Sequence, residues 1–378
     1  MFSRRDFVRA AGAGATGLLS GTVVGARGRE AFSAERLDWS PAQGGIVRLN
    51  SNENPNGPCR AALAAVQDAL RDANRYPGGP VSALQAAVAA HAGVPESHVI
   101  LGCGSSDILR MATCAATGPG RALVTAAPTF ESPEGHASAR GAEVRALPMT
   151  ADLKIDLGGM IEAARGAGMF FVCNPNNPTG TLHGADAIEQ FVARAQAAAP
   201  DALILIDEAY HEYVEDASYR SAVALTSRPN VLVSRTFSKV YGMAGLRVGY
   251  GIGSPATIAR LRGERFGNSV NVLGAAAALA ALGDTGVIAA ERRLNREARE
   301  FTRAALERIG YPSLASHANF ILVDVRQDAR ALAQACRAEG IAIGRPFPPL
   351  TGHARISIGT MDEMIRAVPV LTRALTAA

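Results

Sequence analysis

The sequence predicts an α/β protein with a large domain built on a mainly parallel seven-stranded sheet and a smaller α+β domain at its C-terminal end. Two observations lead to this fold class. From residue 60 onward, helical patterns alternate with short apolar runs, which is the order of elements that builds a parallel sheet. Beyond residue 271 the helical patterns lengthen before strands return, and a chain of 378 residues is long enough for two domains.

The elements of the large domain follow one another closely. A first helix is predicted over 60–73, after Pro58, and a second from Pro80 to about Gly93, because proline is favoured at helix starts and glycine at helix ends. A third helix is expected at 108–116. Seven apolar runs predict the strands of the sheet, at 99–101, 122–125, 143–147, 169–173, 202–206, 231–234 and 247–251.

The smaller domain is predicted from a different pattern of elements. Its helices are expected at 273–282 and 291–309, and its strands at 319–325, 341–344 and 355–358. The expected boundaries along the whole chain are a signal segment at 1–28, an N-terminal arm at 29–58, the large domain at 59–271 and the small domain at 272–378.

The N-terminus resembles a twin-arginine export signal. Arg4 and Arg5 stand in a short charged segment, and an uncharged run rich in alanine and glycine follows at 10–26. Five glycines between Gly12 and Gly25 make this run too weakly apolar for a membrane span of roughly twenty residues. We therefore expect recognition by the twin-arginine export machinery, no stable membrane anchor, and a periplasmic or otherwise exported protein. A disordered basic start of a cytoplasmic protein is the alternative.

Charge and cysteine usage exclude two kinds of partner. The net charge of +4 arises from 38 basic and 34 acidic residues spread along the chain, without the basic block that nucleic acid would need. The five cysteines form no C-x-x-C pair, and no metal-ligand spacing results from them and the few histidines. We expect no nucleic-acid partner, no metal, and isolated buried thiols. The cysteines are Cys59, Cys103, Cys114, Cys173 and Cys336.

The segment 234–249 contains the most specific chemical pattern. It begins Ser-Arg-Thr-Phe-Ser-Lys, ends Ala-Gly-Leu-Arg-Val-Gly, and resembles the class I/II aminotransferases, enzymes of fold type I that use pyridoxal 5′-phosphate (PLP). The resemblance implies that Lys239 forms a Schiff base with PLP. It also implies that Thr236, Ser238 and Arg247 bind the PLP phosphate, and a loop at the end of a strand can gather such groups around a dianion. A lone lysine, by contrast, is usually a solvated surface group.

Two upstream motifs fit the same family. The segment 173–180, Cys-Asn-Pro-Asn-Asn-Pro-Thr-Gly, follows an apolar run, and the resemblance implies that Asn177 hydrogen-bonds the 3′-oxygen of PLP. As bare chemistry this segment predicts only a turn. The strand at 202–206 precedes Asp207, which the resemblance pairs with the protonated pyridine nitrogen, and Tyr210 is assigned to the 3′-oxygen. A helix cap is the alternative role for Asp207.

A glycine-rich turn at 102–107 has the form of a phosphate cup. It lies between a predicted strand and a predicted helix, where backbone amides and serine hydroxyls bind anions. In the family this cup holds the PLP phosphate, and the resemblance implies that Ser105 and Ser106 bind it. Ser105 as a plain helix cap is the alternative. Phe130 corresponds to the aromatic residue that stacks on the cofactor ring.

Three residues are assigned from a closer resemblance, to the histidinol-phosphate aminotransferase-like group. Tyr76 corresponds to a tyrosine that reaches the PLP phosphate of the partner subunit, which implies a homodimer with shared active sites. Arg355 corresponds to an arginine that clamps the α-carboxylate in bidentate fashion. Arg345 corresponds to an arginine that faces the distal end of the substrate, and the alternative is a surface arginine at a strand end.

The resemblance covers residues 45–375 and implies a PLP-dependent aminotransferase. Its expected catalytic residues are Lys239, Asp207 and Tyr210. Its expected substrates are a small-molecule amino donor and a 2-oxo acid acceptor, the donor being an amino acid or an amino-phosphate such as histidinol phosphate.

Other reactions and the identity of the substrate stay open in the sequence. PLP enzymes of another type, such as a cyclase, decarboxylase or racemase, share these motifs, because the pocket decides which bond of the substrate Cα is broken. A non-catalytic PLP-binding protein is a further alternative. The segments 54–58, 265–271 and 344–349 differ from the histidinol-phosphate pattern, so the substrate does not follow from the resemblance.

Overall fold

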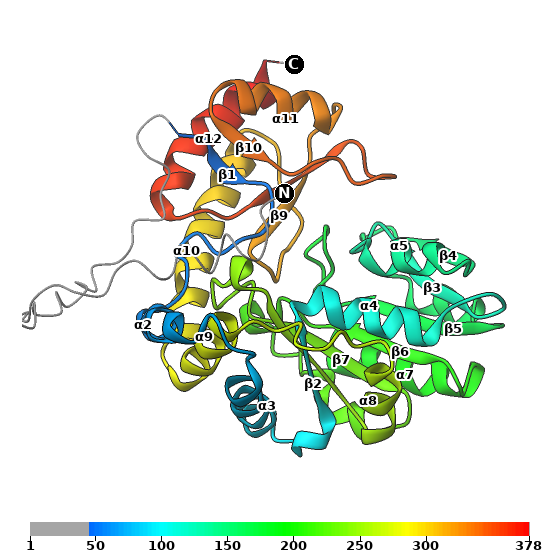
Figure 1. Cartoon of the computed structure of the whole chain (residues 1–378). Coiled ribbons are helices and arrows are strands. Elements are labelled where there is room, and N and C mark those ends of the chain that lie inside the picture. Colours follow the sequence, from blue (N-terminus) through cyan, green and yellow to red (C-terminus); the bar gives the residue numbers. More distant parts are fainter. Residues whose placement is uncertain (1–44, 378) are drawn as a thin grey trace, which may run out of the picture. The chain divides into compact units, whose positions relative to one another are not determined.

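Seven strands form one central sheet in the computed structural model of the protein, which describes residues 45–377 (Figure 1). The strands are β2 (Val99–Cys103), β3 (Ala122–Ala127), β4 (Val144–Pro148), β5 (Ala167–Cys173), β6 (Leu203–Asp207), β7 (Val231–Thr236) and β8 (Val248–Gly253). Their order is β2-β8-β7-β6-β5-β3-β4. β8 runs antiparallel to β2 and β7, and the other neighbours are parallel. The predicted α/β class with a mainly parallel sheet of seven strands is confirmed.

Helices cover both faces of this sheet. On one face lie α4 (Ser105–Ala116), α5 (Ser132–Ala139) and α8 (Pro255–Arg262), and on the other α6 (Leu157–Glu162) and α7 (Ala185–Ala198). Consecutive residues of β5 show the division, because Met169 and Phe171 belong to the core with α4, whereas Phe170 and Val172 belong to the core with α7. A strand that is buried on both faces consists of consecutive apolar residues, and this pattern allowed the strands to be predicted from the sequence.

Three further helices pack beside the antiparallel end of the sheet. They are α2 (Arg60–Ala69), α3 (Gly78–Ala92) and α9 (Val272–Gly283). Their apolar side chains share one core with β2 and β8, and α9 contacts both α2 and α3. The sequence assigned α9 to the small domain, and in the structure this helix packs against α2 and α3. The second helix begins at Gly78 rather than at the predicted Pro80.

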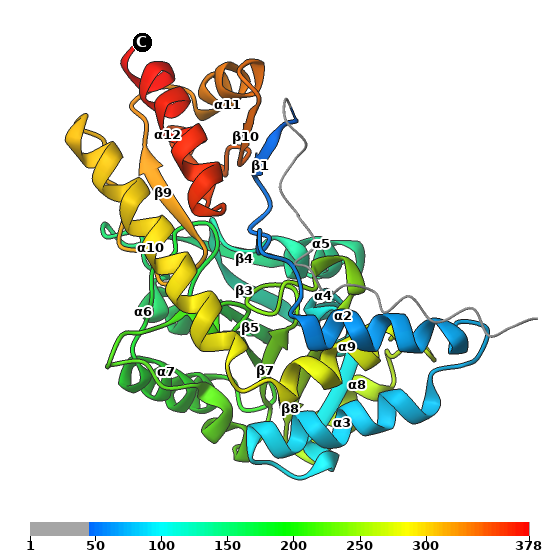
Figure 2. The same cartoon turned by 90° about the vertical axis from the view of Figure 1, so that its left-hand side faces the viewer.

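The C-terminal elements build a second apolar core. In it α10 (Val287–Arg308), α11 (Ala329–Ala338) and α12 (Met361–Thr376) pack around β1 (Val47–Leu49), β9 (Phe320–Asp324), β10 (Ile341–Ile343) and β11 (His353–Ser357). β9 pairs antiparallel with β11, and β1 pairs parallel with β10, so the predicted arm contributes a strand that the sequence did not reveal. Figure 2 shows α10 running from the sheet toward this core. The exact domain boundaries stay a prediction.

The remaining elements are short, and some predictions concern residues beyond the described range. The described part of the chain also contains five 3-10 helices, at Leu70–Asp72, Glu96–His98, His211–Tyr213, Ala222–Ser227 and Ala244–Leu246. The predicted signal at 1–28 and the arm up to residue 44 lie outside the described residues. Among residues 45–377 no single helix is long and apolar enough to cross a membrane, and α9 with α10 meets those criteria only as a pair bent by 88°.

The cysteines are free thiols, as expected, but not all of them are buried. Cys173 and Cys336 are buried, in agreement with the prediction. Cys59, Cys103 and Cys114 are partly exposed, which corrects the prediction for these three.

Candidate active site

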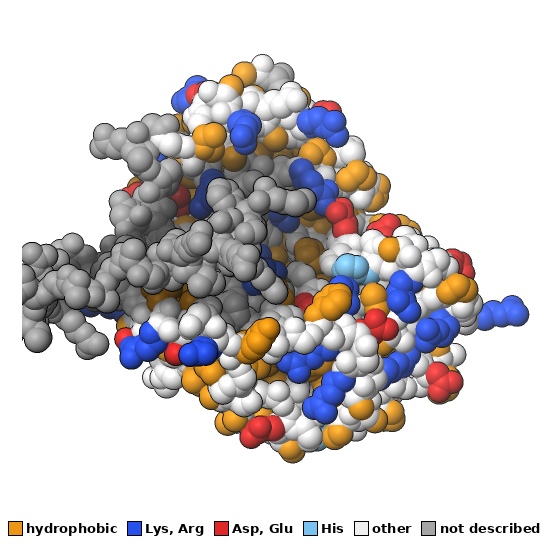
Figure 3. Space-filling model, in the orientation of Figure 1, with side chains coloured by type: hydrophobic (Ala, Val, Ile, Leu, Met, Phe, Trp, Pro, Cys, Tyr) orange, Lys and Arg blue, Asp and Glu red, His pale blue; other side chains and the backbone are white. Residues whose placement is uncertain are grey.

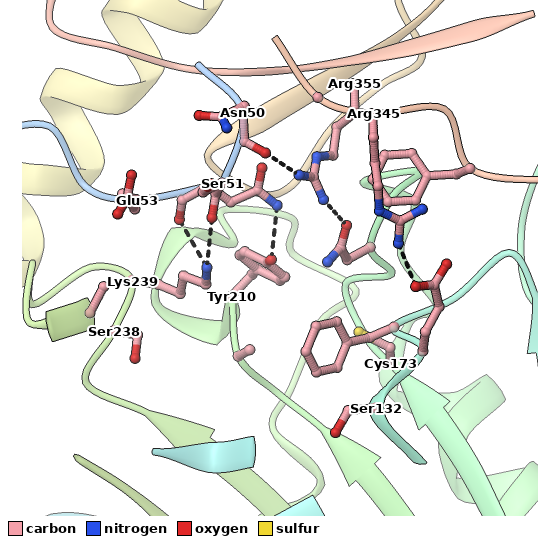
Figure 4. Close-up of a pocket in the computed structure, with 18 of the residues that line it drawn as sticks. Asn50, Ser51, Glu53, Ser132, Cys173, Tyr210, Ser238, Lys239, Arg345 and Arg355 are labelled. Atoms are coloured by element: carbon pink, nitrogen blue, oxygen red, sulfur yellow. Dashed lines mark hydrogen bonds and ion pairs between the residues drawn. The ribbon is translucent and has the colours of Figure 1, made fainter. Parts of the chain in front are cut away.

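A cavity of about 1090 Å³ lies between the carboxyl ends of the central strands and the C-terminal core. Figure 3 shows a hollow on this face with Lys and Arg side chains around it, and Figure 4 shows some of the side chains that line the cavity. Twelve of the thirteen predicted site residues line it: Ser105, Ser106, Phe130, Asn177, Asp207, Tyr210, Thr236, Ser238, Lys239, Arg247, Arg345 and Arg355. Tyr76 does not line it and is 86% exposed.

One end of the cavity has the donors that a phosphate dianion requires. Ser105 is the first residue of α4, where backbone amides point outward, and Thr236 ends β7. The Thr236 hydroxyl donates to Ser238 Oγ at 2.9 Å, and Arg247 Nη1 lies 3.5 Å from the same oxygen. Hydroxyls, helix amides and a guanidinium therefore share this end. The residue at the cap position of α4 is Gly104, so the alternative role of Ser105 as the cap is wrong.

Glycines allow the parts of this cup to approach one another. A Cβ on Gly104 would lie 2.3 Å from Arg247 Nη2, and a Cβ on Gly249 would lie 2.2 Å from the Ser105 nitrogen. Arg247 was predicted to begin a strand, but β8 begins at Val248, and Arg247 has a left-handed φ of 56°. The predicted extended conformation of Arg247 is therefore wrong. Its left-handed backbone brings the guanidinium against Gly104.

Asp207 is a buried carboxylate at the end of β6. It is 2% exposed, the Ser234 hydroxyl donates to its Oδ1, and the Cys173 sulfur lies 3.9 Å from its Oδ2. Burial raises the pKa of Asp207 to about 6, while the hydrogen bond from Ser234 acts in the opposite direction. The carboxyl is therefore mostly ionised at neutral pH. Its alternative role as a helix cap is wrong. Asp207 is the last residue of β6, and its side-chain carboxylate accepts a hydrogen bond from Ser234 of the neighbouring strand β7.

A buried ion pair fixes the residue next to Asp207. Glu208 is 1% exposed, and its Oε2 accepts hydrogen bonds from Arg235 Nε at 3.0 Å and Nη2 at 2.9 Å. The Ser221 hydroxyl and the Ala222 amide also donate to this carboxylate, at 2.8 and 2.7 Å. Because Glu208 follows β6 and Arg235 lies in β7, the pair holds the ends of both strands together.

Lys239 projects into the cavity beside Tyr210 (Figure 4). Its Nζ donates to the carbonyl of Asn52 at 3.0 Å and lies 5.6 Å from the centre of the Tyr210 ring. Burial, and after it the positive charge of Arg355, lowers the pKa of Lys239 to about 8. Such an amine loses its proton more readily than an ordinary lysine, as a nucleophile or base must.

Asn52 is a site residue that the sequence reasoning did not assign. It is 1% exposed and has a left-handed φ of 54°. Its Nδ2 donates to the Tyr210 hydroxyl at 3.1 Å, and its Oδ1 accepts from the Ser357 hydroxyl at 2.8 Å. The available signal was its place in an asparagine-rich segment, because asparagine tolerates the left-handed conformation better than most residues.

Arg355 lies in β11 and is almost buried, at 7% exposure. Its Nη1 donates to Asn177 Oδ1 and its Nη2 to the Asn50 carbonyl, both at 2.7 Å. The guanidinium lies 4.7 Å from the centre of the Phe347 ring, and its Nε is buried without a hydrogen-bond partner among the described residues. Burial lowers the pKa of Arg355 to about 10, which still leaves it cationic at neutral pH.

Arg345 lies at the outer end of the cavity. Its side chain is 54% exposed, its Nη2 is paired with Glu131, and its Cζ lies 4.5 Å from the centre of the Phe347 ring. It is thus half-exposed, as a surface arginine would be, but it also lines the cavity. Glu131 and Phe347 line the same end and were not predicted.

Comparison with known proteins identifies the family. Residues 45–371 match the family Aminotransferase class I and II. The chain belongs to this family. The histidinol-phosphate aminotransferase of Symbiobacterium thermophilum is 37% identical over 333 residues, which cover 87% of this chain and 91% of the relative. Histidinol-phosphate aminotransferase 2 of Pseudomonas aeruginosa is 39% identical, and the match covers 90% of this chain and 92% of the relative.

A solved structure of the same kind contains the cofactor. The crystal structure of histidinol-phosphate aminotransferase from Sinorhizobium meliloti in complex with PLP matches this aminotransferase with a TM-score of 0.82 at 29% identity. The match covers 88% of this chain and 91% of the other. The predicted fold-type I enzyme, its PLP cofactor and its aminotransferase activity are confirmed. These relatives favour amino transfer over the other PLP reactions that the sequence left open.

The residues of the cavity fit PLP. The cup around Arg247 suits a phosphate, the ionised Asp207 suits a protonated ring nitrogen, and the amine of Lys239 suits an aldehyde. When bound, PLP supplies an electron sink for the negative charge that develops at the substrate Cα. The enzyme transfers an amino group between an amino donor and a 2-oxo acid.

We predict that Lys239 titrates near pH 8 in the cofactor-free protein, because burial and then Arg355 disfavour its ammonium form. The folded state should lose stability as the pH falls from 10.5 to about 8, because the unfolded chain then binds a proton that the folded chain does not. NMR of ¹³C-methylated lysines measures the midpoint. The chain has two lysines, so Lys154→Arg assigns the signals. Arg355→Ala should raise the midpoint, and a wild-type midpoint of 10.5 would contradict the prediction.

Proposed function

We propose that Lys239 holds PLP covalently and moves the proton between the substrate Cα and the cofactor carbon C4′. The observation that supports this role is its lowered pKa, about 8, in a cavity that also contains Asp207. An amine with this pKa can act as a nucleophile and as a base near neutral pH. The other lysine, Lys154, does not line the cavity.

Other cavity residues are proposed to bind and tune the cofactor. Asp207 keeps the ring nitrogen protonated, since its own ionised form predominates at neutral pH. Tyr210 and Asn177 donate to the 3′-oxygen and thereby stabilise its ionised form. Phe130 stacks on the ring. The phosphate is held by Ser105, Ser106, Thr236, Ser238 and Arg247.

We propose that the amino donor is an α-amino acid whose carboxylate binds Arg355. The buried guanidinium with a free Nε among the described residues supports this assignment. Histidinol phosphate is the second candidate, because relatives that are 37% and 39% identical carry it in their names. A panel of donors mixed with the PLP form distinguishes them, because a true donor converts the cofactor to its amino form without any keto acid, which the absorption spectrum reports.

The two arginines of the substrate site should have different effects on specificity. Arg355→Ala should weaken all donors with an α-carboxylate alike, because it removes a contact that they share. Arg345→Ala should lower kcat/KM roughly tenfold for donors with an acidic or polar distal group and leave small neutral donors almost unchanged. Steady-state kinetics on both classes of donor measure this difference. Equal losses in both classes for Arg345→Ala would contradict a selective role.

We also propose a homodimer in which Tyr76 reaches the PLP phosphate of the partner subunit. The exposure of Tyr76, 86%, and of Leu70 in the preceding 3-10 helix, 56%, supports a surface that a second copy covers. The family's phosphate-binding tyrosine at this position is the second support, since Tyr76 does not line the cavity of its own chain.

Mixing two inactive or impaired variants tests this sharing. Hybrids of Tyr76→Phe and Lys239→Ala subunits should have one site with both lesions and one intact, which restores about a quarter of all sites after full exchange. Activity above that of the unmixed variants measures the recovery. A matched control mixes Arg247→Ala with Lys239→Ala, whose residues line the cavity of the same chain, and should recover nothing. No recovery in the first mixture, with exchange verified, would contradict sharing.

We propose, finally, that the enzyme is exported through the twin-arginine pathway. Arg4 and Arg5 with the weakly apolar run at 10–26 support this location, and the pathway accepts folded proteins that already hold a cofactor. Arg4→Lys with Arg5→Lys should keep the protein in the cytoplasm, whereas Arg9→Lys, just outside the pair, should not. Fractionation of cells that make each form measures this. Retention of the wild type in the cytoplasm would refute the proposal.

A further inference from the structure

Glu131 stands among arginines at the outer end of the cavity. Arg330 and Arg337 belong to α11, and Arg345 follows β10. All three arginines line the cavity together with Glu131. The charge of this carboxylate therefore weakens the attraction of the cavity for an anion.

The ion pair of Glu131 with Arg345 joins two distant parts of the chain. Glu131 follows Phe130 after β3, whereas Arg345 belongs to the segment between β10 and β11. Arg345 Nη2 donates to Glu131 Oε2, as the dashed line from Arg345 in Figure 4 shows. The two side chains are 54% and 56% exposed. Pairs this exposed are weak, so a polar group of a substrate can open the pair and replace either partner.

The pair is also connected with the proposed carboxylate site. Two guanidiniums contact the Phe347 ring, with Arg345 Cζ 4.5 Å and Arg355 Cζ 4.7 Å from its centre. Burial is the main cause of the lowered pKa of Arg355. Among the charges that also act on this pKa, Arg345 lowers it and Glu131 raises it. Glu131 thus offsets positive charge where the distal end of a donor held by Arg355 would lie.

We propose that Glu131 is a specificity-determining residue for the distal end of the amino donor. The proposal rests on the roles proposed above for Arg355 and Arg345. The carboxylate of Glu131 competes with a distal anion for Arg345, and it accepts a hydrogen bond from a distal N–H. An uncharged group with both an acceptor and a donor, such as a carboxamide, satisfies both residues at once. The site therefore favours a distal amide over the isosteric acid.

Donor pairs that differ only in the distal group test this preference. Suitable pairs are aspartate with asparagine, glutamate with glutamine, and 2-aminoadipate with its 6-amide. The quantity measured is the ratio of kcat/KM for the acid to kcat/KM for the amide, because damage to the fold lowers both and leaves the ratio unchanged. Glu131→Gln should raise this ratio roughly fivefold, since it removes the competing charge at constant size. Glu131→Asp keeps the charge and should stay close to the wild type.

Two further measurements separate the possible outcomes. In an Arg345→Ala background the effect of Glu131→Gln should shrink, because the group for which it competes is absent. Binding of glutarate and of its monoamide to the holoenzyme, read from the absorption spectrum, gives the same ratio without turnover. An unchanged ratio in Glu131→Gln, while Arg345→Ala still weakens acidic donors, would overturn the role of Glu131 and leave the proposed function intact. If Arg345→Ala and Arg355→Ala also have no effect, the substrate-binding roles proposed for both arginines fail too.

Discussion

The geometry of the site depends on the buried ion pair between Glu208 and Arg235. Two charges taken out of water are tolerated only where their hydrogen-bonding groups find partners, and here the Ser221 hydroxyl and the Ala222 amide complete the bonding of the carboxylate. Such a pair contributes little net stability. We infer that it instead fixes the relative position of the ends of β6 and β7, and with it that of Asp207.

The parallel order of β5, β6 and β7 then determines which side chains meet. The carboxyl ends of parallel neighbours lie at the same edge of a sheet, and Asn177, Asp207 and Lys239 follow or end these three strands. Burial acts on the two charges there in opposite directions, raising the pKa of Asp207 to about 6 and lowering that of Lys239 to about 8. Between these values the carboxylate is mostly ionised, while the amine is close enough to its pKa to exchange a proton.

Local patterns in the sequence were sufficient for the sheet and for most of the cavity. Buried strands are continuous apolar runs, and the residues around the cofactor lie in contiguous motifs. The sequence did not predict the roles of Asn52 and Glu131, because their hydrogen-bond partners lie 158 and 214 residues away in the chain. β1 has three residues and, within residues 45–377, pairs with β10 alone, so it had no periodicity of its own to detect. The left-handed backbone of Arg247 was not predictable from the sequence either, because no local rule places a non-glycine residue in that conformation.

The short segment after β1 connects the two apolar cores through the site. The carbonyl of Asn50 accepts from Arg355, and the side chain of Asn52 is bonded to Ser357 of β11. The same Asn52 bonds Tyr210 through its amide and Lys239 through its carbonyl. Because β1 is itself paired with β10, this segment cannot move with the sheet alone. The arginine proposed for the substrate carboxylate and the amine proposed for the cofactor are therefore held by one piece of backbone, and a displacement of either core changes the surroundings of both.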